Sequence, residues 1–151
     1  MESGNAMPGE RRIVALENGT AIDHIPPSHA WKVLELLHLP SQPIISVAVN
    51  VPSPKMGKKD IIYVEDLELT PRQIDKIALV AQHATVNIIR NGNVEKKQII
   101  MPPEKVEGVL ICFNPSCISN HEKIPSRFHM IQSPLRAKCH YCERIMEEKQ
   151  I

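Results

Sequence analysis

All four cysteines of the chain lie in two short segments near the C-terminus, CFNPSC and CHYC. Four residues separate Cys112 from Cys117, and two separate Cys139 from Cys142. Two thiol pairs of this kind supply the four soft ligands of a tetrahedral zinc ion. Because sulfur then fills all four positions, no position remains for water or substrate. The pattern therefore predicts one zinc per chain with a structural role.

Other interpretations of the cysteines stay open. Disulfide bonds form in oxidising compartments, and the first residues, MESGNAMPGERR, lack the apolar segment of a secretory signal. A redox-active Cys-His-Tyr-Cys motif would open a helix after a strand and needs no second cysteine pair. Iron fits the same spacing as zinc. His140, inside the second segment, is expected to donate a hydrogen bond to a ligand sulfur.

The segment that carries the cysteines is too small to fold on apolar burial alone, so a metal is expected to hold it together. Its start is marked by the paired prolines of MPPEKVEG, which predict a short stiff linker over residues 102–105. Residues 106–151 then form a small antiparallel β domain. Its candidate strands span residues 106–113, 127–132, 135–139 and 143–146.

The residues before the linker are expected to form a flexible arm over residues 1–12 and a larger domain over residues 13–101. The expected elements are a strand over 12–26 with a turn at Asn18-Gly19, a helix over 26–40 capped by Ser28, strands over 43–52 and 58–66, a helix over 69–82 capped by Thr70 with Gln73 closing a capping box, and a hairpin over 84–100 around Asn91-Gly92. This order predicts an α+β ferredoxin-like sandwich, an antiparallel sheet with two helices on one face.

The polar residues of the first domain favour binding over catalysis. Asp23, Lys59 and Asn87 lie on separate expected strands, where they could contact a base, a sugar hydroxyl and phosphates. The sequence contains no P-loop, dinucleotide fingerprint or nucleophile-elbow serine. A formal charge of +1 and an aromatic content of 3% argue against a nucleic-acid partner, and no apolar run is long enough to cross a bilayer. We expect a cytoplasmic protein.

Five motifs in order, NGTAIDHIP, MGKKD, QIDKIAL, ATVN and the frame CFNPSC…CHYC, resemble the regulatory chain of aspartate carbamoyltransferase, an enzyme of pyrimidine biosynthesis. The resemblance implies a chain with no catalytic activity of its own. It implies a nucleotide-binding domain for the inhibitor CTP and the activator ATP, with UTP acting beside CTP. It further implies a zinc domain that docks on the catalytic chain, in an assembly of two catalytic trimers bridged by three regulatory homodimers.

The resemblance also implies the residues of each site. The zinc ligands are the four cysteines, and the nucleotide-binding residues are Ala15, Asp23, His24, Lys59, Tyr63, Asn87, Ile89, Val94 and Lys97. In this assignment the Ala15 backbone meets the base, Asp23 the ribose, and His24, Lys59 and Lys97 the phosphates. The family often has a lysine where this chain has Tyr63, and the loop around Gly92 differs too.

Functions from other classes are separated by simple observations. A nucleic-acid-binding zinc ribbon, the alternative function, would bind DNA or RNA with a steep dependence on salt. A thiol oxidoreductase would expose a cysteine of low pKa. Co-purification with a catalytic chain of aspartate carbamoyltransferase would favour the regulatory role over both.

Overall fold

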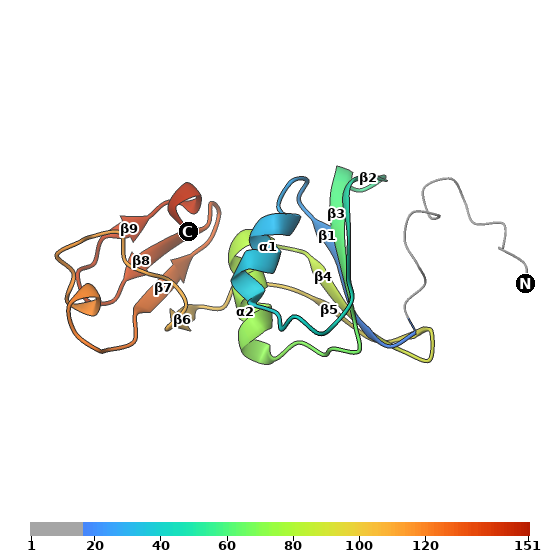
Figure 1. Cartoon of the computed structure of the whole chain (residues 1–151). Helices are drawn as coiled ribbons and strands as arrows, with labels where there is room; N and C mark the ends of the chain where they lie inside the picture. Colours follow the sequence, from blue (N-terminus) through green and yellow to red (C-terminus); the bar gives the residue numbers. More distant parts are fainter. Residues whose placement is uncertain (1–16) are drawn as a thin grey trace, which may run out of the picture.

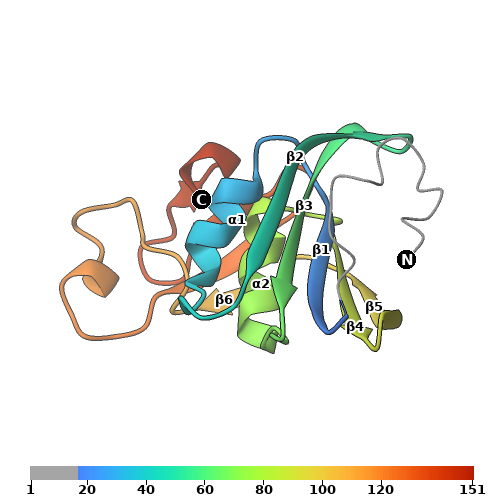
Figure 2. The same cartoon turned by 45° about the vertical axis from the view of Figure 1, so that its right-hand side comes forward.

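We describe residues 17–151 in a computed structural model. The first domain contains β1 (Gly19–Ile25), α1 (Ala30–Leu37), β2 (Ile45–Ser53), β3 (Gly57–Glu65), α2 (Pro71–Val80), β4 (Thr85–Arg90) and β5 (Asn93–Ile99). Its five strands form one antiparallel sheet in the order β2-β3-β1-β4-β5. Both helices cover the same face of this sheet (Figures 1 and 2). The predicted α+β sandwich is confirmed.

The core of this domain lies between the helices and one face of the sheet. Ile22 pairs with Ile62 on one side and with Val86 on the other, and all three side chains are buried. The helices contribute the rest of the core, chiefly Ala30, Val33 and Leu37 from α1 and Ile77 and Ala78 from α2. Because side chains alternate between the two faces of a strand, the neighbours of Ile22, Ile62 and Val86 face away from the helices.

Local sequence signals account for α2 and for the last hairpin. The Thr70 hydroxyl accepts a hydrogen bond from the Gln73 backbone at 3.2 Å, and the Gln73 side chain accepts one from the Thr70 backbone at 2.9 Å. This is the predicted capping box. The β4–β5 turn places Asn91 and Gly92 at φ values of 52° and 76°, the left-handed region that an Asn-Gly hairpin turn requires.

The prediction that Ser28 caps α1 is wrong. The helix starts after His29, which makes no side-chain capping bond, and Ser28 has a φ of 69°. A side chain from the sheet, that of Asp60, caps the start of α1 instead. The carboxylate of Asp60, fully buried on β3, accepts a hydrogen bond from the Ala30 backbone at 3.1 Å and another from the Asn50 backbone at 2.9 Å.

The C-terminal domain is a small antiparallel sheet with strand order β6-β7-β8-β9. It contains β6 (Lys105–Glu107), η1 (Ile118–Asn120), β7 (Arg127–Ile131), β8 (Arg136–Cys139), β9 (Ile145–Met146) and η2 (Glu148–Gln150). The strands predicted over 127–132, 135–139 and 143–146 are present in shorter form. The strand predicted over 106–113 is wrong beyond Glu107, because Gly108 turns the chain at a φ of 69° and the next residues lead into the first cysteine turn.

The two domains meet through α2, so the helices lie between the two sheets (Figure 1). Leu79 of α2 is 2% exposed and packs in the core of the C-terminal domain with Val106 and Phe128. Arg72 of the same helix donates a hydrogen bond to the Gly108 carbonyl at 2.8 Å. The uncovered face of the five-stranded sheet therefore points away from the C-terminal domain (Figure 1).

Candidate functional site

The four cysteines converge on one point. All four Sγ atoms lie within 4.8 Å of one another, and Cys112, Cys117 and Cys139 are buried. Two of the sulfur pairs are 3.6 Å and 3.7 Å apart, Cys112 with Cys142 and Cys117 with Cys139. A tetrahedral zinc with Zn–S bonds of about 2.3 Å separates its sulfurs by about 3.8 Å. The cluster therefore fits a structural zinc ion held by four sulfurs.

Backbone hydrogen bonds shape both cysteine turns. In the first, the Asn114 side chain accepts from the Ser116 backbone at 3.1 Å, and the Asn114 carbonyl accepts from the Cys117 backbone at 3.0 Å. Asn120 closes this turn by donating to the carbonyls of Cys112 and Asn114. In the second turn, the Glu143 backbone donates to the Cys139 carbonyl at 3.0 Å. Each pair of sulfurs is thus positioned by a local turn, and the strands of the small sheet bring the two turns together.

The surroundings of the sulfurs differ from the prediction for His140. Its Nδ1 lies 3.1 Å from Nε2 of His129, whereas the Ser119 hydroxyl lies 3.1 Å from Cys117 Sγ. Ser119 follows the first cysteine turn by two residues, a position where a hydroxyl could have been suspected. Burial raises the pKa of the Cys112 thiol to about 12. Zinc binding must therefore displace a proton from it.

The polar residues predicted for nucleotide binding lie on the uncovered face of the five-stranded sheet. The strand register forms a row across β3, β1, β4 and β5, in which Ala21 pairs with Tyr63 and with Asn87, and Asn87 pairs with Lys97. In the adjacent row Ile89 pairs with Val94. None of these residues belongs to the core packed against the helices. We call this surface the open face.

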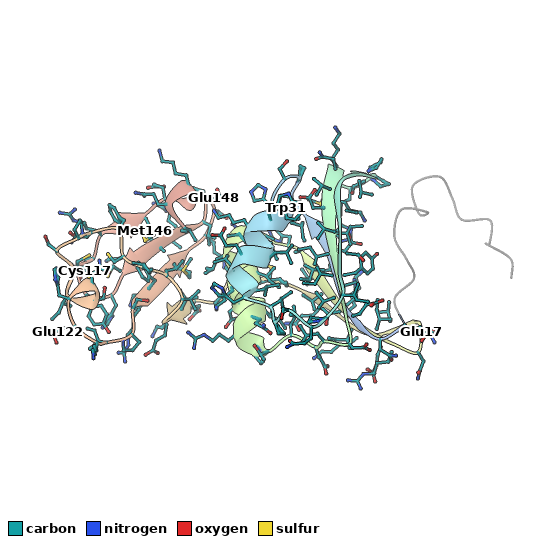
Figure 3. The ribbon with its side chains drawn as sticks, viewed as in Figure 1. Glu17, Trp31, Cys117, Glu122, Met146 and Glu148 are labelled. Carbon is teal, nitrogen blue, oxygen red and sulfur yellow. The ribbon has the colours of Figure 1, made fainter. Side chains whose placement is uncertain are left out.

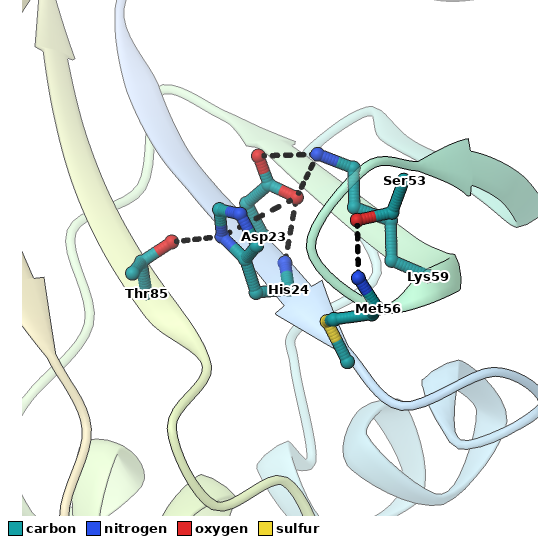
Figure 4. Close-up of polar contacts among 6 residues, drawn as sticks. All are labelled: Asp23, His24, Ser53, Met56, Lys59 and Thr85. Carbon is teal, nitrogen blue, oxygen red and sulfur yellow. Dashed lines mark hydrogen bonds and ion pairs between the residues drawn. The ribbon is translucent and has the colours of Figure 1, made fainter.

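Asp23, His24 and Lys59 form a connected cluster at one end of the open face (Figure 4). Lys59 Nζ lies 3.0 Å and 3.2 Å from the two carboxylate oxygens of Asp23. The Asp23 carboxylate also accepts a hydrogen bond from the His24 backbone at 2.6 Å, and His24 has a φ of 58°. The His24 ring reaches Thr85 on β4, with Nδ1 3.1 Å from the hydroxyl oxygen.

The charge around His24 is predominantly positive. Burial lowers the pKa of His24 most, the charge of Asp23 acts against this, and Lys59, Lys55 and Lys97 lower the pKa further. The pKa of Tyr63 is raised by burial and by the charge of Asp23, which agrees with its place on the same face. Three lysines thus act on one end of the open face, where an anionic ligand would be attracted.

Two residues of this surface were missed by the sequence analysis, Thr85 and Lys55. Thr85 is the second residue of the ATVN segment and the first of β4, where it pairs with Asp23, and Lys55 lies in the turn between β2 and β3. Ala15, also predicted for this site, lies outside the described residues. A hollow of about 510 Å³ between the domains lies away from the open face and is lined by residues such as Lys32, Leu135 and Glu148.

The fold and the site define a two-domain α+β protein, with an open polar sheet face on one domain and a four-sulfur centre on the other. Two protein-family profiles match the chain and divide it in the same way. Residues 11–101 match the aspartate carbamoyltransferase regulatory chain, allosteric domain, and residues 104–151 match the metal binding domain of the same chain. The chain belongs to the family of aspartate carbamoyltransferase regulatory chains.

Curated relatives agree over nearly the full length. The chain is 47% identical over 146 residues to the aspartate carbamoyltransferase regulatory chain of Pyrococcus abyssi, covering 94% of this chain and 96% of the relative. It is 42% identical over 140 residues to the regulatory chain of Methanocaldococcus jannaschii, covering 92% and 94%. It is therefore a regulatory and not a catalytic chain.

No helix among residues 17–151 is long and apolar enough to cross a membrane.

Proposed function

We propose that the open face binds the nucleotide effectors of aspartate carbamoyltransferase, with CTP as inhibitor, ATP as activator and UTP acting beside CTP. The observation that carries the proposal is the cluster of Asp23, His24 and Lys59, with Lys97 close enough to act on the same imidazole. Lys59 and Lys97 supply cations for the phosphates, and Asp23 can accept a hydrogen bond from a ribose hydroxyl.

The remaining candidate residues give this face its selectivity. Asn87 offers an amide that both donates and accepts, which suits a base edge, while Ile89 and Val94 supply apolar contact beside it. Tyr63, across β1 from Asn87, offers a neutral phenol at the position where the family often has a lysine. In our proposal the Ala15 backbone completes the contacts to the base.

Coupling between the two domains would pass through α2. This helix places Ile77 and Ala78 in the core beneath the sheet and Leu79 in the core of the zinc domain. A shift of the sheet on nucleotide binding would move α2, and Leu79 and Arg72 would transmit that shift to the zinc domain. A nucleotide can change the enzyme only if it binds the two quaternary states with different affinity.

The zinc domain would dock on the catalytic chain through the surface around its first cysteine turn. Ile111 is 79% exposed and Phe113 and Ile118 are exposed as well, so apolar side chains surround Cys112 and Cys117 on the outside. Figure 3 shows Cys117 at the end of the molecule remote from the first domain. Exposed apolar residues gathered in one place are typical of a protein-binding surface.

Assembly also requires a regulatory homodimer, and β2 offers a surface for it. This strand forms one edge of the five-stranded sheet and exposes Ile45 and Val49. An unpaired edge can pair with a second copy of the chain. Three such dimers would bridge two catalytic trimers in the cytoplasm. Residues 13–101 would carry the effectors, residues 102–105 would link the domains, and residues 106–151 would bind the catalytic chain.

Reconstitution with catalytic trimers tests the proposal. The chain alone should show no carbamoyl transfer, and its addition to the trimers should make their activity respond to millimolar CTP and ATP. Lys59→Gln should weaken the CTP response, whereas Lys58→Gln, one residue earlier and exposed, should leave it unchanged. A complex that assembles but ignores both nucleotides would contradict the allosteric role.

A further inference from the structure

The zinc domain carries a second hollow that the proposed function does not use. It has a volume of about 320 Å³ and lies beside β6, β7 and the turn after β8. Its polar lining consists of Lys105, Glu107, Arg127, His129 and His140. Val106 and Phe128 lie between these residues on the two strands and also line the hollow, while their side chains point to the other face of the sheet and are buried in the core of the domain. We call this hollow the β6–β7 pocket.

Two histidines are held in contact at its rim. His129 Nε2 lies 3.1 Å from His140 Nδ1, so one ring donates a hydrogen bond to the other. The His140 ring also packs edge-on against Tyr141 at a centroid distance of 5.2 Å, and the Tyr141 hydroxyl donates to the Pro125 carbonyl at 3.0 Å. This chain of contacts fixes the orientation of the pair. Each ring keeps one further nitrogen for a ligand.

Positive charge surrounds the pair. Lys105 on β6 and Lys138 on β8 are the register partners of His129, so the histidine lies in a row between two lysines. Arg127 lines the same pocket and uses its Nε to donate to Glu107 at 3.3 Å, which leaves its other N–H groups free of that contact. The one acidic group of the lining is therefore already engaged by Arg127.

A metal ion would fit this arrangement poorly. Two imidazole nitrogens alone rarely hold a metal, and the lysines and the arginine would repel a cation. In the part of the chain that the structure describes, the four cysteines are the one group of three or more metal-ligating side chains whose ligand atoms converge. An anion has the opposite preference. It gains charge-assisted hydrogen bonds from Lys105 and Arg127 and accepts an N–H from the histidine pair.

We propose that the β6–β7 pocket binds a phosphate group, either as inorganic phosphate or as the phosphoryl end of a small phosphate ester. A pocket of this volume is at the lower limit of ligand sites and suits a small anion better than a whole nucleotide. Guanidinium and imidazole N–H groups match the several acceptor oxygens of a phosphate. The site is separate from the open face, because it lies on the other domain.

Nuclear magnetic resonance of the full chain tests this proposal. The ring signals of His129 and His140 are followed at fixed pH while inorganic phosphate replaces chloride at constant ionic strength. We expect a saturable shift of both rings, which reports on this pocket whatever happens at the open face. A parallel titration with glycerol phosphate distinguishes the sources, because tighter binding of the ester identifies it as the ligand class and equal or weaker binding identifies the free anion.

Variants show whether the pocket itself is responsible. Lys105→Gln should weaken phosphate binding by about tenfold, the effect expected for one charge-assisted hydrogen bond, and Arg127→Gln should do the same. Lys105→Arg should retain binding. Lys123→Gln, an exposed change of equal charge elsewhere in the zinc domain, is the matched control and should bind as the parent does. Zinc content and circular dichroism must match the parent for each variant compared.

Three results would overturn the proposal. The first is a shift that does not saturate at phosphate concentrations up to about 50 mM, since binding weaker than this has no specific site behind it. The second is equal phosphate affinity in the parent, Lys105→Gln and Arg127→Gln. The third is a saturable response of the two histidines to Ni²⁺ with none to phosphate, which would make the pair a metal site.

Discussion

Replacement of Tyr63 by lysine should tighten the binding of CTP to this chain by about tenfold or more. Tyr63 lies on the open face, separated from Asn87 only by Ala21 of β1. Neighbouring strands are about 5 Å apart, so a ligand that lies over β1 is within reach of the side chains at both positions. A lysine there would add a cation where the phenol offers only a neutral donor.

The size of the effect follows from the surroundings of Tyr63. A charge-assisted hydrogen bond contributes about 1.5–3 kcal/mol when partly desolvated, and 1.4 kcal/mol corresponds to about tenfold in affinity. Tyr63 is only partly buried, which favours the lower end. The new lysine would also be attracted to Asp23, whose charge already acts on Tyr63 and which is paired with Lys59 at 3.0 Å. This competition reduces the gain, so a hundredfold effect is not expected.

Calorimetric titration of the parent, Tyr63→Lys and Tyr63→Phe with CTP and with ATP decides the matter. CTP should gain more than ATP, since we expect poor discrimination in the parent, and Tyr63→Phe should isolate the contribution of the hydroxyl. Gln42→Lys adds the same charge in an exposed loop and controls for a general electrostatic effect. Equal CTP affinity in Tyr63→Lys and the parent would refute the reasoning and place residue 63 outside the site.

Three further predictions follow from the metal centre, the imidazole and the domain contact. Cys139→Ser should unfold the zinc domain and abolish binding to catalytic trimers, while the first domain keeps its own thermal transition; metal analysis, calorimetry and gel filtration check this. His24 has a lowered pKa and is neutral at pH 7, whereas bound phosphates would raise that pKa, so CTP binding should take up a proton and tighten as the pH falls from about 8 to 6. His24→Gln should flatten this dependence in calorimetry; an unchanged slope would exclude His24. Leu79→Ala removes packing of about 2–5 kcal/mol between the domains and should reduce the nucleotide response of reconstituted enzyme while CTP affinity of the chain stays within about twofold. A full response with Leu79→Ala would exclude α2 as the coupling path.

Where a structural feature depends on residues close together in the chain, the sequence was sufficient to predict it. The capping box at the start of α2 involves Thr70 and Gln73, three residues apart, and the hairpin turn needs only Asn91 and Gly92. Both motifs satisfy their own hydrogen bonds or backbone angles locally, so tertiary contacts have little to change. The spacing of the cysteines is predictive for the same reason, because each pair forms one turn.

The incorrect predictions concern groups whose partners are remote in sequence. Ser28 is a good capping residue by type, yet the fold supplies the carboxylate of Asp60 to the start of α1 from a strand 30 residues away. His140 was expected to turn toward sulfur, but β7 brings His129 to within 3.1 Å of it. In both cases the hydrogen bond is made with a partner remote in sequence instead of the local partner that was predicted. Residue type alone does not identify such a partner.

By itself, the sequence determined the α+β order of the elements, the family and the four metal-binding cysteines. Only the tertiary structure decided that Asp23, Lys59 and Thr85 meet at one end of an uncovered sheet face. Asp23 and Lys59 are 36 residues apart, and Thr85 comes from a third strand. Their meeting depends on the strand order β3-β1-β4 and on its register, and a shift of one residue in that register would turn these side chains toward the helices. Burial of Ile22 with Ile62 and Val86 holds the register, because any other pairing would expose that core to water.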